Sequence, residues 1–91
     1  MKDDFKKSFL NDIKKIKNKK LLVKIKDVIK AVESAQNMQD IPDLKKLKGS
    51  RKGIYYRIKI DDYRIGVSIE NEMVTFVVFG ARKDIYKHFP S

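Results

Sequence analysis

The chain is 91 residues long and carries 22 lysines and arginines against 12 acidic residues, a net charge of +10, with no cysteine. This length suits one domain over residues 1–91, and the lack of cysteine excludes disulfides, thiolate metal sites and cysteine nucleophiles. No apolar run is long enough to cross a membrane and no signal peptide is evident, so we expect a cytoplasmic protein without a membrane partner.

Two amphipathic helices are predicted in the first part of the chain. Phe5, Phe9, Ile13 and Ile16 are spaced four, four and three residues apart, which places them on one stripe of a helix. Residues 18–20 interrupt this pattern. A second stripe then follows, formed by Leu22, Ile25, Val28, Ile29, Val32 and Ala35. The two stripes predict an αα-hairpin whose apolar face covers another element.

Residues 36–53 are predicted to be mostly irregular. Pro42 disfavours helix at the residue before it, so residues 40–43 should stop the second helix. Residues 44–49 are interpreted as a short turn or the lead-in to a strand. Residues 50–53, which include Arg51 and Lys52, are expected to form an exposed basic loop.

Three strands are predicted next, at residues 54–60, 63–69 and 73–79, joined by the polar pairs Asp61-Asp62 and Asn71-Glu72. Two-residue hairpin loops give a register in which the alternating apolar residues share one face. That face, the expected floor for the helices, carries Ile54, Tyr56, Ile58, Ile60, Tyr63, Ile65, Val67, Ile69, Val74, Phe76 and Val78. The other, open face carries Tyr55, Arg57, Lys59, Arg64, Gly66, Ser68, Glu70, Met73, Thr75, Val77 and Phe79.

The last ten residues are predicted to form a short helical turn or an irregular tail. Ile85 and Phe89 are four residues apart and should pack inward. Arg82, Lys83 and Tyr86 would then be available to the open face of the sheet.

A cationic cluster on this open face is the most informative feature of the sequence. In the predicted register Lys59 lies directly opposite Arg64, and like charges in such a pair are destabilising. The cluster therefore suggests an anionic partner, either nucleic acid or an acidic protein. The alternative is a solvated surface, or one that faces a protein partner, with no chemistry of its own.

The residue types present limit the kinds of site that the cationic cluster could form. His88 is the only histidine, no carboxylates have ligand spacing, and phosphate-binding glycine motifs are absent, so we expect neither a metal nor a cofactor. RNA can be cleaved when its own 2′-hydroxyl attacks the adjacent phosphorus, which requires a base, positive charge and an acid. Arginines supply charge and bidentate donors, and a lysine crowded by other cations is suited to act as a base. Both phosphodiester cleavage and simple binding remain open at this point.

Several segments together resemble the RelE/ParE superfamily of toxins from bacterial type II toxin–antitoxin systems. The resemblance covers nearly the whole chain. It depends on residues 5–9, 12–16, 44–49, 56–60 and 62–66, and on the ending Arg82-Lys83-Asp84-Ile85-Tyr86 with Phe89-Pro90.

The resemblance implies an α+β fold, with an N-terminal αα-hairpin packed on one face of a three- to four-stranded antiparallel sheet and a short C-terminal helical turn. It also implies an mRNA endoribonuclease that often acts at the ribosomal A site, and a small acidic antitoxin as partner. Lys59 would be the general base, and Tyr86 would orient the nucleotide. The remaining catalytic residues implied are Arg57, Arg64 and Arg82. Further RNA contacts are expected from Lys45, Lys46, Lys48, Arg51, Lys52, Tyr55 and Lys83.

The sequence departs from the family pattern at two places. Ala81 stands where close relatives have a histidine. One alternative is therefore a catalytically decayed toxin that only binds its antitoxin. The family has a short first strand, but the residues before Phe5 are too polar to show the pattern of a strand. The sheet is therefore expected to have three strands or a weak fourth. A further alternative is the ParE branch, which shares the fold but poisons DNA gyrase.

Overall fold

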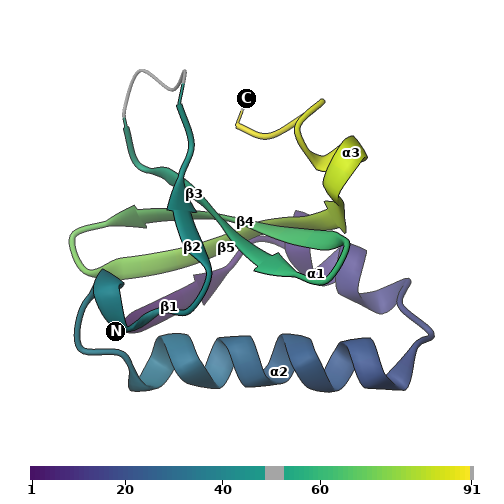
Figure 1. Ribbon diagram of the computed structural model, residues 1–91, viewed down its shortest axis with the longest axis horizontal. Helices are drawn as coiled ribbons and strands as arrows, with labels where there is room; N and C mark the ends of the chain where they lie inside the picture. Colours follow the sequence, from purple (N-terminus) through teal and green to yellow (C-terminus); the bar gives the residue numbers. More distant parts are fainter. Residues whose placement is uncertain (49–52, 91) are drawn as a thin grey trace.

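The computed structural model describes residues 1–48 and 53–90. It is a mixed five-stranded sheet with the strand order β1-β5-β4-β3-β2. Helices α1 (Lys7–Lys14) and α2 (Lys19–Ser34) lie on one side of the sheet, and the short helix α3 (Arg82–Ile85) with the C-terminal segment lies on the other (Figure 1). The strands are β1 (Lys2–Phe5), β2 (Leu44–Lys46), β3 (Tyr55–Ile60), β4 (Tyr63–Glu70) and β5 (Met73–Ala81), with a 3-10 turn, η1, at Met38–Asp40.

The αα-hairpin is confirmed, with shifted helix ends. The Asn18 side chain caps α2 by accepting hydrogen bonds from the backbone N–H groups of Lys20 and Leu21, at 3.0 and 3.2 Å. Lys19 and Lys20 therefore begin the second helix, where the sequence pattern had suggested an interruption. Phe5 was expected on the first helix and instead ends β1.

Both predicted hairpins form, the first in the expected register throughout and the second in the expected register from its turn as far as the pair Val67 and Phe76. Ile60 pairs with Tyr63 across the first turn, and Glu70 pairs with Met73 across the second. Lys59 lies opposite Arg64, as predicted. The alternation of apolar residues and the polar two-residue turns therefore specified this part of the sheet.

The sheet has five strands where three or four were expected, because the weak edge strand near the N-terminus forms as β1 and β2 adds a strand at the other edge. β1 pairs in parallel with β5, so that Phe5 lies beside Phe76 with their rings stacked at 5.1 Å. β2 pairs antiparallel with β3, and Lys45 lies beside Arg57. Both edge strands are short and rich in charged residues, a composition that protects sheet edges but gives little strand signal in a sequence.

A β-bulge in β5 overturns part of the predicted face assignment. Phe76 pairs with Val67 whereas Val78 pairs with Gly66, so Val77 is an extra residue on β5. Beyond the bulge, Phe79 lies beside Ile65 and is buried on the helix side, where its ring stacks on Tyr63 at 5.3 Å. Val78 turns to the opposite face. Their predicted faces were therefore exchanged.

The main core lies between the helix pair and the sheet. Phe9, Ile25 and Val32 from the helices are buried against the sheet residues Ile65 and Phe76. Burial of this apolar surface is the main favourable contribution to the stability of the fold. No helix in the described part of the chain has both the length and the apolar content needed to span a bilayer.

The turn between β4 and β5 is strained at Glu72. Asn71 and Glu72 have φ angles of 52° and 64°, which is the left-handed conformation. A two-residue hairpin turn of this kind favours glycine as its second residue. Glu72→Gly should therefore stabilise the protein by about 1 kcal/mol, seen as a rise of about 5 °C in the midpoint of thermal unfolding. Glu72→Ala removes the same charge and keeps the strain, so equal midpoints for the two variants would contradict this explanation.

Candidate functional site

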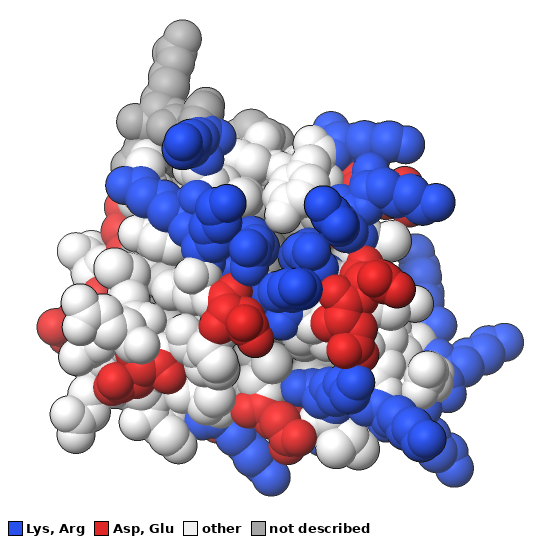
Figure 2. Space-filling model, in the orientation of Figure 1, with Lys and Arg blue, Asp and Glu red and all other residues white. Residues whose placement is uncertain are grey.

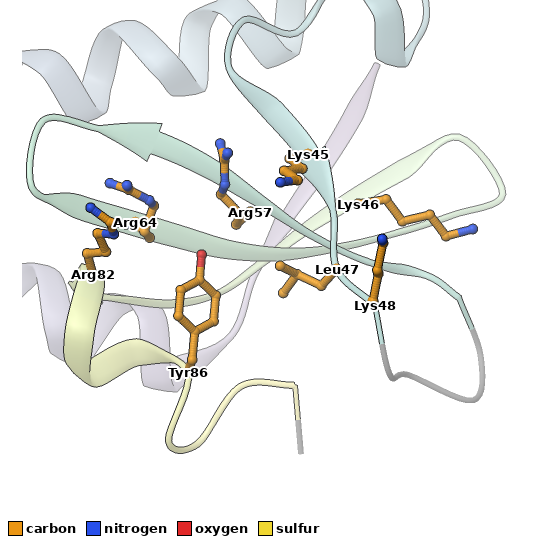
Figure 3. Close-up of a pocket in the computed structure, with 8 residues that line it drawn as sticks. All are labelled: Lys45, Lys46, Leu47, Lys48, Arg57, Arg64, Arg82 and Tyr86. Carbon is orange, nitrogen blue, oxygen red and sulfur yellow. The ribbon is translucent and has the colours of Figure 1, made fainter.

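A cationic cavity of about 400 Å³ lies where β2, β3 and β4 meet the C-terminal segment. Its lining consists of Lys45, Lys46, Leu47, Lys48, Arg57, Arg64, Arg82 and Tyr86 (Figure 3). The hydroxyl of Tyr86 points into the space between Arg57 on one side and Arg64 with Arg82 on the other. Four separate segments of the chain thus bring their polar groups to one hollow.

Backbone carbonyl groups hold two of the arginines in place. Arg64 is only 7% exposed, and its Nη1 donates hydrogen bonds to the carbonyl oxygens of Asp61 and Tyr63, at 2.9 and 2.8 Å. Arg57 Nη1 donates to the carbonyl oxygen of Asp43 at 2.8 Å. These bonds orient each guanidinium group without neutralising its charge. The remaining N–H donors are available to a ligand, since each guanidinium has five.

The cavity combines strong positive charge with an absence of acidic lining. Six of its eight lining residues are lysine or arginine, and none is acidic. The described residues form two ion pairs, Lys24 with Asp61 and Lys87 with Asp84, and neither includes a lining residue of the cavity. Blue side chains accordingly gather across this side of the molecule, with acidic groups at its margins (Figure 2). Such unneutralised charge favours an anionic ligand.

The C-terminal segment is packed on the sheet through Gly66. Phe89 is 3% exposed and contacts Tyr55 edge-to-face, with ring centroids 5.4 Å apart. A β-carbon on Gly66 would lie only 2.7 Å from Phe89 and from Val78, so the segment can approach the sheet because this residue is glycine. Phe89 and the buried Ile85 thus hold the segment that carries Tyr86.

A second cavity, of about 680 Å³, adjoins the first at the C-terminal segment. It is lined by Asp62, Ala81, Arg82, Lys83 and Tyr86, so Arg82 and Tyr86 border both spaces. The backbone N–H of Arg82 donates to the carbonyl oxygen of Asp62 at 2.9 Å, which ties the start of α3 to the β3–β4 turn. An extended ligand in the cationic cavity therefore has room to continue past Tyr86.

Most of the predicted site residues lie together, and a few do not. Arg57, Arg64, Arg82, Tyr86 and three of the predicted lysines share the cationic cavity, and Lys83 lines the second one. Lys59 is exposed beside Arg64 in the sheet register but is not among the residues that line the cavity. Tyr55 packs against Phe89. The predicted contacts Arg51 and Lys52 lie outside the described residues. Leu47 was missed, because an apolar residue among lysines gives no signal for a binding site.

This arrangement can bind an anion and stabilise charge that develops on it. Guanidinium groups bind phosphate oxygens through paired hydrogen bonds, and their contribution is largest where they are already oriented. The hydroxyl of Tyr86 adds a group that can donate or accept a hydrogen bond. The size and charge of the cavity suit a phosphodiester with one or two attached nucleosides.

Three comparisons with known proteins extend these observations. Residues 4–86 match the family model described as ParE toxin of type II toxin-antitoxin system, parDE. A curated relative, Toxin RelE3 of Methanocaldococcus jannaschii, is 34% identical over 99% of this chain and 100% of its own length. The fold is similar to the crystal structure of a RelB-RelE antitoxin-toxin complex from Methanococcus jannaschii, at 31% identity, a TM-score of 0.78, and coverage of 96% of this chain and 99% of that one. The archaeal RelE-RelB complex from Pyrococcus horikoshii, with 17% identity and a TM-score of 0.71 over 91% and 96% of the two chains, shares the fold.

Close packing at Gly66 generates a prediction. Gly66→Ala should displace Phe89 and destabilise the protein by about 1–3 kcal/mol, because a β-carbon 2.7 Å from Phe89 and Val78 forces a neighbouring side chain to shift. Thermal unfolding measures the loss, and the resonances of Tyr86 and Phe89 in NMR spectra report the displacement. Gly80→Ala is the matched control, since its β-carbon would lie 3.9 Å from Ile85, an ordinary contact. Equal effects of the two substitutions would show that the approach at Gly66 is unimportant.

Proposed function

Because the chain belongs to the RelE/ParE superfamily of toxins from type II toxin–antitoxin systems, we propose that it acts as an mRNA endoribonuclease with the cationic cavity as its site. The observation that carries this proposal is the set of oriented, unneutralised cations around Tyr86. Single-stranded RNA supplies both the phosphate for these cations and a base for stacking on tyrosine. The sequence resemblance to the RelE-like branch favours a ribosome-bound message as the substrate.

The proposed reaction uses the RNA's own 2′-hydroxyl as the nucleophile. The 2′-oxygen bonds to the adjacent phosphorus as its proton leaves, and the bond to the 5′-oxygen of the next nucleotide breaks as that oxygen gains a proton. The products are a 2′,3′-cyclic phosphate and a free 5′-hydroxyl. Negative charge increases on the phosphorane oxygens, where Arg57, Arg64 and Arg82 would stabilise it. Tyr86 would orient the attacked nucleotide.

Charge stabilisation is the contribution that the geometry supports best. Lys59 as the general base remains a prediction, because its side chain is exposed outside the lining of the cavity. Ala81 borders the second cavity and offers no proton donor at that position. A site that relies on charge and positioning can still accelerate this reaction, since both lower the barrier without a matched acid and base.

The first functional prediction concerns Arg82. Its side chain is exposed at the cavity, so Arg82→Ala should leave the fold intact and lower RNA cleavage by roughly 100-fold or more through lost charge stabilisation. The measurement is the mapping of new mRNA 5′ ends by primer extension in a translating extract. Lys30→Ala, which removes an exposed cation from α2, is the matched control and should cleave like the wild type.

Two outcomes would contradict the proposal. Equal cleavage by Arg82→Ala and the wild type would place the chemistry elsewhere. No new 5′ ends with the wild-type protein, in an extract where another toxin cleaves, would remove the nuclease function itself. Inhibition of DNA supercoiling by gyrase without RNA loss would then support the ParE-like alternative. Unaffected growth on overexpression, with intact antitoxin binding, would support a decayed toxin.

An antitoxin partner follows from family membership, and a groove between the helices is suited to it. An apolar cleft of about 230 Å³ is lined by Phe5, Phe9, Leu10, Ile13, Leu22, Ile25, Lys26 and Ile29. Leu10 is 45% exposed there although it is a large apolar side chain. Lys26 of α2 lines the cleft and would attract a carboxylate. We propose that an amphipathic, acidic helix of the antitoxin packs into this cleft.

Substitution of Leu10 tests this contact. Leu10→Asp should weaken binding of the cognate antitoxin at least about tenfold, since it places a charge among apolar groups. Isothermal titration calorimetry measures the affinity. Val23→Asp introduces the same charge on α2 at a side chain that is 56% exposed and does not line the cleft. Equal affinities for the two variants would exclude the cleft as the docking surface.

A further inference from the structure

Helix α1 completes the edge of β5 at the point where β1 ends. The last backbone bond along this edge runs from the N–H of Lys6 to the carbonyl oxygen of Phe76, at 2.9 Å. Beyond it the chain turns into α1, so no strand among residues 1–48 and 53–90 covers the second half of β5 on this side. Backbone groups there require other partners, since an unpaired, partly buried group is costly.

Two polar side chains of α1 supply these partners. The Ser8 hydroxyl donates a hydrogen bond to the carbonyl oxygen of Val77, and Asp12 Oδ2 accepts one from the backbone N–H of Phe79, at 3.0 Å. Ser8 and Asp12 are four residues apart, one turn of the helix, so both face the same strand. They bond to the extra residue Val77 and to Phe79 two residues later, where a neighbouring strand would otherwise pair.

The bulge decides where the cations of the proposed site lie. It shifts the pairing so that Arg64 lies beside Gly80 and Tyr63 beside Ala81. Arg82 follows at once as the first residue of α3, and Tyr86 ends that helix. Without the extra residue, every later residue of β5 would face the opposite side of the sheet. Arg82 and Tyr86 would then leave the cavity.

We propose that Asp12, assisted by Ser8, is a positioning residue for the cationic cavity. The carboxylate does not reach the cavity, and it acts by holding the β5 bulge in the register that places Arg82 and Tyr86 beside Arg64. This inference rests on the proposed function only for its catalytic consequence. The structural part concerns the conformation of β5 and is tested separately.

The test uses the full-length protein with Asp12→Ala and Asp12→Asn. Asparagine retains a side-chain oxygen that accepts from the N–H of Phe79, whereas alanine does not. We expect Asp12→Ala to lower RNA cleavage at least tenfold, to speed hydrogen exchange of the Phe79 amide, and to shift the NMR resonances of Gly80, Arg82 and Tyr86. Asp12→Asn should restore all three toward the wild type.

A control separates positioning from loss of stability. Val32→Ala removes buried apolar volume from α2, far along the chain from the bulge, and should lower the unfolding temperature without changing cleavage or the Arg82 resonances. Unchanged resonances from Phe79 to Tyr86 in Asp12→Ala would overturn the inference, and so would an equal activity loss in Val32→Ala. A wild-type protein that cleaves no RNA would refute the proposed function, and the exchange and resonance data would still decide the role of Asp12.

Discussion

The register of β5 against β4 is the constraint on which the rest of the structure depends. One extra residue at Val77 turns Phe79 into the main core and Val78 toward the C-terminal segment. Val78 and Gly66 then form the surface on which Phe89 packs. Because the same shift carries the end of β5 to the β3–β4 turn, α3 begins beside Arg64. The core on one face of the sheet and the cationic cavity on the other therefore share one cause.

The positive charge of the cavity favours the binding of an anionic ligand. Backbone carbonyl groups orient Arg57 and Arg64, but they leave the net positive charge in place. Clustered cations oppose folding through their mutual repulsion, and an anionic partner that binds the folded state would offset this cost. RNA and an acidic antitoxin both meet this description. If their contacts overlap, binding of RNA would weaken binding of the antitoxin, and binding of the antitoxin would weaken binding of RNA, since coupling between ligands is reciprocal.

Much of the fold and of the site could be predicted from the sequence, for identifiable reasons. The alternation in β3 and β4 and the polar turns between strands gave the register, and with it the position of Lys59 opposite Arg64. β1 could be anticipated only as a weak edge strand, because its partner, β5, is distant in the sequence and its residues are mostly charged. The bulge was missed because Val77, Val78 and Phe79 are all apolar, so a shift of one residue leaves the pattern of hydrophobicity unchanged. Most of the side chains that line the cavity could be predicted from the sequence. The alternation of residues along β3 predicts the face on which Lys59 lies, but it does not predict that its side chain lies outside the lining of the cavity.

In the proposed function, the cationic cavity binds a phosphodiester of RNA through its arginines. The most direct test is an NMR titration that follows the backbone amide groups and the arginine side-chain Nε–H groups, with a short RNA whose 2′-hydroxyl is methylated, so that it binds without being cut. Saturable shifts are expected at Arg57, Arg64 and Arg82, with a change at the ring of Tyr86. Saturable shifts confined to the lysine-rich helix α2, with the three arginines unaffected, would contradict this proposal.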